Sequence, residues 1–328
     1  MTPSEKRFPI SVIIPAHNAV TSLPGTLISL MKQTMREFEC IIVDDASTDG
    51  TADIARKFID ENHLATHWKV VSEANSIPKG VSNARNRGMS ASIGDFLFFL
   101  DADDVLEVEC LATLLDAQQR YDADLVACNI LKCKPNGHST PQVSNKHLET
   151  QWHFSPDDLR DLINGLPFFD SSCAKLFRRS LLEKAQLQFH EKMPFGEDTL
   201  FTCRAAILSR HIVILTKYCG YHYLLHDSSS SARMAPRDRL ASLQLLLFSL
   251  NQEASVQHKS ILLRKSCEYL WTIRKTGGTD TWKLLRETLS SPLWKEILYP
   301  VIVVHGKWKH RVCARLLNQR HLWAIKLW

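Results

Sequence analysis

The chain reads Phe96-Leu97-Phe98-Phe99-Leu100-Asp101-Ala102-Asp103-Asp104 at the point where five apolar residues meet three carboxylates. The apolar run predicts a buried strand, and in open parallel sheets ligands bind at the carboxyl ends of the strands. Crowded carboxylates repel one another, and a hard divalent cation, Mg²⁺ or Mn²⁺ rather than Zn²⁺, is the usual way to offset that repulsion. In an alternative interpretation, Asp103 or Asp104 is the N-cap of a helix that starts near Val105.

The first 130 residues repeat this alternation of short apolar runs with longer amphipathic ones. The pattern predicts an α/β fold with a mostly parallel sheet flanked by helices. We expect strands at residues 10–15, 39–44, 68–72, 95–100 and 124–130. We expect helices near residues 22–34, 50–62, 80–92 and 107–120. Polar residues follow the first three strands, namely His17, Asn18, Asp44, Asp45, Glu73 and Asn75.

The rest of the chain predicts a second lobe and a helical extension. Residues 131–155 lack periodicity and are interpreted as a loop that joins two lobes of one domain. The second lobe is expected to contain residues 171–177, a helix at 198–209 and a strand at 212–216. From Pro236 onward the pattern becomes mainly helical. We therefore predict one domain over residues 1–235, with halves 1–130 and 131–235, and a helical C-terminal extension over 236–328.

Cysteine usage and hydropathy predict a cytoplasmic protein. Nine cysteines include no CxxC pair, so their spacing indicates neither a disulfide framework nor a cysteine-ligated zinc site. A reducing compartment is the simpler interpretation. The polar residues 1–7 lead directly into a strand-like run, which argues against a signal peptide. The longest apolar runs are far below the roughly 20 residues that span a bilayer.

A second strand end carries the carboxylate pair Asp44-Asp45, followed by the sequence ASTDGT. One acid at such a position can accept hydrogen bonds from a base or a ribose. We assign Asp45 to base contact, because it lies past the end of the strand. Ser47 and Asp49 are interpreted as turn and capping residues.

Four motifs, in order, resemble family 2 glycosyltransferases of the GT-A fold, a Rossmann-like fold of nucleotide-diphospho-sugar transferases. They are PISVIIPAHN at 9–18, VDDASTDGT at 43–51, GVSNARN at 80–86 and DADD at 101–104. The resemblance implies that residues 1–130 bind the nucleotide and residues 131–235 the acceptor. It assigns Pro15 and Asn18 to the nucleotide pocket, Asp45 to the base, Lys79 or Arg85 to the nucleotide edge, and Asp101 and Asp103 to the metal and ribose motif. Asp103 is the expected direct metal ligand, and the alternative for Arg85 is an exposed helical arginine.

The sequence FGEDTLF at 195–201 resembles the Glu-Asp motif of this family, whose second acid is the general base in inverting members. Displacement at an anomeric carbon needs a carboxylate within hydrogen-bond reach of the acceptor hydroxyl. Asp198 is therefore the candidate base, and Glu197 a neighbouring or acceptor contact. A Glu-Asp pair before an apolar helix is also an ordinary helix start.

Two later segments resemble further parts of the family pattern. SSCAKLFRR at 171–179 resembles a Lys-Leu-aromatic strand beside the acceptor site, which assigns Lys175 to the acceptor. YHYLLHDS at 221–228 resembles a loop that closes over the diphosphate in many members. His226 stands there where an arginine or another polar residue is often seen, and we assign it to metal or phosphate contact. A packed, hydrogen-bonded surface histidine is the alternative.

Residues 305–328 carry six Lys or Arg residues, three Trp residues and no acids. Such a segment is typical of a membrane interface, which would place a lipid-linked acceptor close by. A helix packed on the protein with a basic solvated face is the other interpretation. Nucleic acid is not an expected partner, because no recognised binding module accompanies the charge.

Taken with the resemblance, these residues predict a metal-dependent inverting glycosyltransferase with Mn²⁺ or Mg²⁺ as cofactor. It would move a sugar from a nucleotide-sugar donor, a UDP-sugar first of all, to a saccharide or lipid-linked saccharide acceptor at the inner face of the cell membrane, in cell-envelope polysaccharide synthesis. A sugar nucleotidyltransferase would need a Gly-rich loop after the first strand, which the residues from His17 to Val20 do not supply. A non-catalytic nucleotide-sugar-binding scaffold stays open as an alternative.

Overall fold

The structure is a computed structural model, and it describes residues 8–72, 77–143, 152–154, 167–193, 195–225, 236–252, 259–276, 278–305, 308–319, 321 and 324–325. The chain packs as two compact units. The first comprises Met1–Pro156, Pro167–Glu191 and Phe201–Asp227. The second comprises Asp157–Leu166, Lys192–Leu200 and Ser228–Trp328, so it includes three segments that the sequence alone grouped with the first domain, namely 157–166, 192–200 and 228–235.

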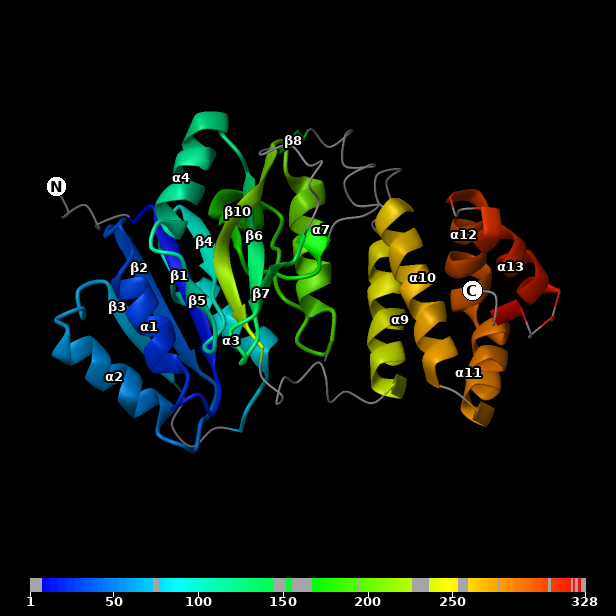
Figure 1. Cartoon of the computed structure of the whole chain (residues 1–328), viewed down its shortest axis with the longest axis horizontal. Helices are drawn as coiled ribbons and strands as arrows, with labels where there is room; N and C mark the ends of the chain where they lie inside the picture. Colours follow the sequence, from blue (N-terminus) through cyan, green and yellow to red (C-terminus); the bar gives the residue numbers. More distant parts are fainter. Residues whose placement is uncertain are drawn as a thin grey trace. The chain divides into compact units, whose positions relative to one another are not determined.

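The first unit contains one mixed sheet in the order β3-β2-β1-β4-β9-β6-β10-β5 (Figure 1). Four strands are parallel to one another, namely β1 (Ile10–Ala16), β2 (Phe38–Asp44), β3 (Trp68–Ser72) and β4 (Phe96–Phe99). Strand β9 (Lys175–Arg178) runs antiparallel between β4 and β6 (Leu125–Cys133). Strand β10 (Ile212–Leu224) is parallel to β6 and antiparallel to β5 (Val105–Leu106). The predicted α/β fold with a mostly parallel sheet is confirmed.

The sequence predicted a loop at residues 131–155, but the structure contains strands in this range. Strand β6 continues to Cys133 and pairs with β7 (Ser139–Pro141), and β8 (Trp152–Phe154) pairs antiparallel with β10. The polar composition hid β7 in particular, because all three of its residues are exposed and a strand without a buried face shows no apolar alternation.

Helices cover both faces of this sheet (Figure 1). Four of them follow the predicted ranges closely, namely α1 (Leu23–Met31), α2 (Thr51–Glu61), α3 (Val81–Ala91) and α4 (Cys110–Tyr121). Buried residues of α1, α2 and α4 share one hydrophobic cluster with β1 and β4. Helix α3 packs on the other face, where Ala84 meets Ile41 and Val43. Because both faces are covered, every residue of β1 and β2 is buried.

An aromatic cluster lies on the same face as α3. The ring of Phe99 on β4 lies 5.1 Å from that of Phe189 and 5.7 Å from that of Phe201. Phe177 on β9 lies 5.4 Å from Phe201, which belongs to helix α7 (Glu197–Leu208). These contacts fix residues 189 and 201 against the strand that ends at the carboxylate motif.

Helix α3 approaches β1 closely at Gly88. A Cβ atom there would lie 2.3 Å from Cγ2 of Ile13 and 3.2 Å from Cγ2 of Val43. We expect Gly88→Ala to destabilise the protein by about 1–3 kcal/mol, because the added methyl group forces the helix off the sheet. In α1, Gly25 has nothing within 4 Å of its Cβ position, so Gly25→Ala should be neutral or slightly stabilising. Thermal unfolding of both variants checks this, and equal midpoints would contradict it.

The second unit is helical in the part that the structure describes (Figure 1). Its helices are α9 (Pro236–Gln252), α10 (Lys259–Thr276), α11 (Gly278–Ser290), the π-helical segment η3 (Leu293–Leu298), α12 (Tyr299–His305) and α13 (Trp308–Asn318). Trp294 is buried among them and its Nε1 donates to Oδ1 of Asn318 at 3.1 Å. The predicted helical C-terminal region is confirmed.

Helix α13 is amphipathic, with a buried apolar face and an exposed basic one. Cys313, Ala314 and Leu317 are buried, whereas Arg311 and Arg315 are exposed. The described part of the basic tail therefore matches the packed-helix interpretation. Trp323 and Trp328 lie outside the described residues. No helix in the described ranges has the length and apolarity that a bilayer span requires.

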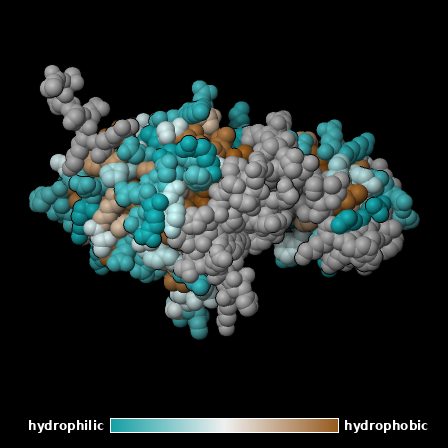
Figure 2. Space-filling view, turned by 90° about the horizontal axis from the view of Figure 1, so that it is seen from above, coloured by the Kyte–Doolittle hydropathy of each residue, from teal (hydrophilic) through white to brown (hydrophobic). Residues whose placement is uncertain are grey.

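The face seen in Figure 2 is mainly hydrophilic where residues are described, with apolar side chains in small separate patches. Such a surface is expected when helices cover both sides of a sheet, because most of the large apolar side chains are then buried in the interior.

Candidate active site

The carboxyl ends of β1, β2 and β4 bring three predicted motifs to one edge of the sheet. Ala16 at the end of β1 is in register with Asp44 at the end of β2, and Ile13 with Phe99 at the end of β4. The residues that follow each strand therefore lie on neighbouring loops, as the sequence predicted. Pro15 is buried within β1, in register with Val43.

Hydrogen bonds join the loop after β1 to the loop after β2. The backbone N–H of Asn18 donates to Ser47 Oγ at 2.9 Å, and Asn18 Oδ1 accepts from the N–H of Thr48 at 2.9 Å. Asn18 has a φ of 50°, a left-handed conformation that asparagine tolerates better than most residues. Asp49 accepts from the N–H groups of Thr51 and Val20, both at 3.0 Å. Ser47 and Asp49 therefore lie in the predicted turn, whereas the N-cap position of α2 is taken by Gly50, without a side-chain cap hydrogen bond.

Asp45 holds the loop that leads into α3. Its buried carboxylate accepts from the backbone N–H of Lys79 at 2.9 Å and from that of Gly80 at 2.7 Å. Gly80 has a φ of 92°, which a residue with a side chain adopts only under strain. Asp45 thus ties the end of β2 to the start of α3, while the Lys79 side chain is exposed beside it. Contact of Asp45 and Lys79 with a nucleotide stays a prediction.

Arg85 is not the exposed helical arginine of the alternative interpretation. Its side chain is 3% exposed, and its Nη2 lies 3.0 Å from Oδ1 of Asp101. The guanidinium also stacks over the ring of Phe189, 5.2 Å from the centroid. The second carboxylate oxygen of Asp101 accepts from Cys173 Sγ at 3.4 Å. Arg85 therefore neutralises Asp101 from the protein side of the loop.

Asp104 does not cap a helix that starts near Val105. Residues Val105–Leu106 form strand β5, and α4 begins only at Cys110. The side chain of Asp104 is 0% exposed and accepts from Tyr221 Oη at 2.6 Å. Burial, reinforced by the negative charge of Asp101, raises the pKa of Asp104 to about 8. The neutral form of this carboxyl group is therefore favoured more than in a solvated aspartate.

The crowded acids are thus relieved in two ways that the sequence did not indicate. Asp101 is paired with Arg85, and the raised pKa of Asp104 favours its neutral form, so mutual repulsion does not by itself require a cation here. Asp103 is exposed, and it is the member of the motif whose carboxylate faces outward. A ligand that binds at this site would therefore meet the exposed carboxylate of Asp103 and the partly exposed carboxylate of Asp101.

The donor set can be compared with what a divalent cation needs. Among the described residues no group of three or more His, Cys, Asp and Glu side chains forms a complete metal site. Mg²⁺ is often held by only one or two carboxylates together with substrate phosphates. The exposed Asp103 and the Asp101 carboxylate, whose side chain is 31% exposed, fit that kind of shared site. His226, the third predicted metal ligand, lies outside the described residues.

Lys175 is a buried lysine. It is 1% exposed, and its Nζ donates to the carbonyl oxygen of Cys173 at 2.9 Å inside the sheet. Contact of Lys175 with an acceptor stays a prediction. The Lys-Leu-aromatic strand is part of the core, because Leu176 and Phe177 are also buried.

Glu197 and Asp198 form the first turn of α7, directly after Gly196, whose φ is 84°. Phe195, the residue before Gly196, packs within the second unit. The guanidinium of Arg239 lies 4.9 Å from the centroid of its ring. Both acids are partly exposed. The helix-start interpretation is correct as a description of structure, and it leaves the predicted roles of Asp198 as base and Glu197 as acceptor contact untouched.

Sequence reasoning missed two contributors to this edge of the sheet, Tyr221 and Phe189. Tyr221 was part of a recognised motif, but only the pairing of β10 with β5 brings it to Asp104. Phe189 lies in an irregular segment without a motif, and its place over Arg85 follows from the aromatic cluster.

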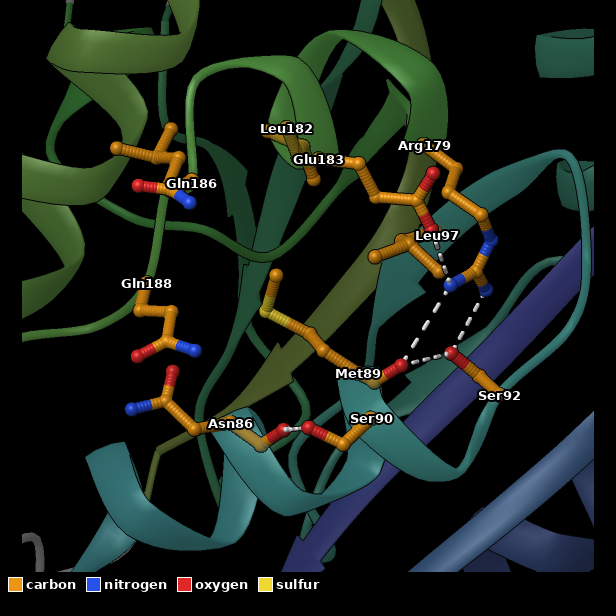
Figure 3. A pocket seen from close by; sticks show the side chains of 11 residues that line it. Asn86, Met89, Ser90, Ser92, Leu97, Arg179, Leu182, Glu183, Gln186 and Gln188 are labelled. Atoms are coloured by element: carbon orange, nitrogen blue, oxygen red, sulfur yellow. Dashed lines mark hydrogen bonds and ion pairs between the residues drawn. The ribbon is translucent and has the colours of Figure 1, made fainter.

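A cavity of about 280 Å³ lies at the other end of α3, between that helix, β4 and α6 (Arg179–Lys184) (Figure 3). None of the predicted site residues lines this cavity. It shares helix α3 with the candidate site. Arg179 in its wall donates to Ser92 Oγ at 2.7 Å and pairs with Glu183 at 3.6 Å. These polar side chains bond to one another, and they give no sign of a missing ligand.

Comparison with known proteins agrees with the geometry. Residues 11–185 match the model of the family described as Glycosyl transferase family 2. A poly(ribitol-phosphate) β-N-acetylglucosaminyltransferase, TarS of Staphylococcus aureus, is 28% identical over 290 residues, 87% of this chain and 47% of TarS. The chain thus spans about half the length of that relative.

Solved structures show the same fold. The crystal structure of S. aureus TarS residues 1–349 in complex with UDP-GlcNAc superposes with a TM-score of 0.77 at 23% identity, covering 97% of this chain and 90% of that one. A mannosyltransferase of Pyrobaculum calidifontis in complex with GDP-Man and Mn²⁺ has a TM-score of 0.57 at 16% identity, covering 98% and 86%. With a family model that matches more than half of the residues, on a GT-A fold, the chain belongs to glycosyl transferase family 2.

Proposed function

We propose that the chain is an inverting glycosyltransferase that uses a nucleotide-sugar donor. The observation that supports this most strongly is the loop after β4, in which Asp103 faces outward while Arg85 and Tyr221 hold its neighbours Asp101 and Asp104 from inside. It lies beside the loops of Asn18 and Asp45, at the edge of the sheet where α/β proteins bind ligands.

In this proposal the base and ribose meet the loops after β1 and β2. Pro15 and Asn18 form the floor and rim of the nucleotide pocket, and Asp45, already fixed by the N–H groups of Lys79 and Gly80, offers its remaining lone pairs to the base. Lys79 lies exposed at the nucleotide edge. Arg85 acts through Asp101, because its guanidinium is buried against that carboxylate.

Asp103, with the partly exposed carboxylate of Asp101, would hold Mn²⁺ or Mg²⁺ together with the donor diphosphate. A bound divalent cation would offset the negative charge that develops on the leaving diphosphate. Asp198 would accept the proton of the acceptor hydroxyl as that oxygen attacks the anomeric carbon, and Glu197 would contact the acceptor. Inversion follows from a single displacement of this kind.

The relatives support a proposal for the substrate class. TarS is named for transfer of N-acetylglucosamine to poly(ribitol-phosphate), and a solved TarS structure holds UDP-GlcNAc. We propose a UDP-sugar donor and a saccharide, polyol-phosphate or lipid-linked acceptor of the cell envelope, used at the inner face of the membrane. The exposed Arg311 and Arg315 of α13 would meet anionic headgroups there. We further propose that residues 1–235 form the catalytic domain and 236–328 an extension of it.

Thermal-shift measurements with a panel of nucleotide sugars test the donor. UDP-GlcNAc, UDP-glucose and GDP-mannose would each be added with Mn²⁺, with Mg²⁺ and with EDTA, followed by donor hydrolysis assays. We expect stabilisation by a UDP-sugar that depends on the metal, since a ligand that binds the folded state raises its stability. Stabilisation by GDP-mannose instead of a UDP-sugar would show that the proposed donor is wrong. If no nucleotide sugar raises the melting temperature, the proposed function is refuted.

A further inference from the structure

A single tyrosine hydroxyl joins both ends of the carboxylate loop. Tyr221 Oη donates to Oδ2 of Asp104 at 2.6 Å and accepts from the backbone N–H of Asp101 at 3.2 Å. The other oxygen of Asp104 accepts from the N–H of Leu224 at 2.9 Å. The loop from Asp101 to Asp104 is thereby closed on strand β10, which is distant in sequence.

Further contacts extend this connection along the strands β5 and β10. Strand β5 pairs antiparallel with β10, with Leu106 opposite Tyr221 and Val105 opposite His222. The N–H of Glu107 donates to the carbonyl oxygen of Gly220 at 3.0 Å, and its carboxylate lies 3.1 Å from Nε2 of His222. The residues just after the carboxylate motif are therefore held in register by β10.

The two side chains in the connection cannot touch a ligand directly. Tyr221 and Asp104 are both 0% exposed, whereas Asp103, between Asp101 and Asp104 in sequence, is exposed. Within the loop the N–H of Asp104 donates to the carbonyl oxygen of Asp101 at 3.2 Å, which closes a tight turn. Any influence of the buried pair on the site must therefore pass through the conformation of this turn.

We infer that Tyr221 and Asp104 are positioning residues that hold the Asp101–Asp103 turn in the conformation that presents Asp103 to a divalent cation and a diphosphate. The inference rests on the proposed function, and it adds a specific consequence. The pair sets how tightly the cation and the nucleotide are bound, and it has little effect on the chemical step once both are in place.

A role in packing alone makes a different prediction. Tyr221→Phe removes one oxygen atom and keeps the ring, so it disturbs the core very little. Tyr269→Phe is a matched control, because Tyr269 is also buried and its hydroxyl lies 3.5 Å from Thr288 Oγ1, in the second unit. If the tyrosine hydroxyls only stabilise the fold, both variants lower the melting temperature and neither changes ligand affinity.

The test uses the full chain, with UDP and Mn²⁺ as probes in calorimetry and UDP-GlcNAc as donor in kinetics. For Tyr221→Phe we expect the Kd of UDP with Mn²⁺ and the KM of the donor to rise about five- to tenfold. We expect kcat at saturating donor and Mn²⁺ to stay within about twofold, and UDP binding in EDTA to stay unchanged. Asp104→Asn keeps groups that can bond to Leu224 and Tyr221, so its effect should be smaller than that of Asp104→Ala.

The outcomes separate this inference from the proposed function. If the unchanged protein binds neither UDP nor UDP-GlcNAc, the proposed function fails and the inference fails with it. If the unchanged protein binds UDP with Mn²⁺ and Tyr221→Phe binds it equally well, the pair is a core contact and the inference alone is wrong. A fall in kcat without a change in Kd or KM would also overturn it.

Discussion

Asp198→Asn is expected to reduce kcat for sugar transfer by about 10²- to 10⁴-fold, the usual contribution of a general base. An amide cannot take the proton from the acceptor hydroxyl, but it occupies the same space at the start of α7. Donor affinity should stay within about twofold, because the donor is bound by other residues in the proposed mechanism. Steady-state kinetics with a saturating acceptor, together with calorimetry for the donor, measure both quantities.

Asp238→Asn is the matched control for this substitution. Asp238 is likewise an acid in the first turn of a helix of the second unit, α9, and it is exposed. An acid at such a position contributes about 0.3–1 kcal/mol through the helix dipole, too little to change kcat a hundredfold. If both variants keep full turnover, Asp198 is a helix-start residue and not the base.

Asp103→Asn is expected to weaken donor binding in the presence of Mn²⁺ at least about tenfold, or about 1.4 kcal/mol. The exposed carboxylate of Asp103 is the proposed direct ligand, and an amide oxygen without the charge is a poorer one for a hard cation. In EDTA the variant and the unchanged protein should bind the donor alike. Titration of the donor by calorimetry at several Mn²⁺ concentrations checks the result.

Asp116→Asn on α4 controls for the loss of one negative surface charge. Asp116 is exposed and pairs with Arg120 at 3.1 Å, one turn along the same helix. We expect this variant to bind donor and Mn²⁺ normally. Normal Mn²⁺-dependent affinity in Asp103→Asn as well would refute its role as the metal ligand and would leave the charge of the motif without a function in donor binding.

The electrostatics of the motif show why charge counting along the sequence was insufficient. Three acids in four positions predicted strong repulsion, and the inference of a metal followed from it. The structure pairs Arg85 of α3 with Asp101, and it buries Asp104 against Tyr221, where burial raises the pKa of the Asp104 carboxyl group. The role of a cation therefore depends on Asp103 and on the phosphates of the donor, which is a narrower proposal.

Lys175 shows the same limitation. A lysine in a motif near a predicted acceptor site suggests a contact with substrate, but its ammonium group is buried and bonded to Cys173. The strand β9 that carries it lies between β4 and β6 in a sheet with both faces covered, so the side chains of Lys175, Leu176 and Phe177 are buried. Local sequence does not reveal which strands flank a residue, and so it cannot tell a buried lysine from an exposed one.

The sequence by itself determined the α/β fold, the strands β1 to β4 with their helices, and the edge of the sheet where the motifs meet. It could do so because apolar periodicity and turn residues are local, and because parallel strands carry their carboxyl ends to one side. Only the tertiary structure decided which acid faces outward, which is neutralised by Arg85 and which is bonded to Tyr221. These outcomes depend on two long-range contacts: Arg85 and Asp101 are separated by 16 positions in the sequence, and Asp104 and Tyr221 by 117. Burial and pairing of charges arise only when such distant segments meet.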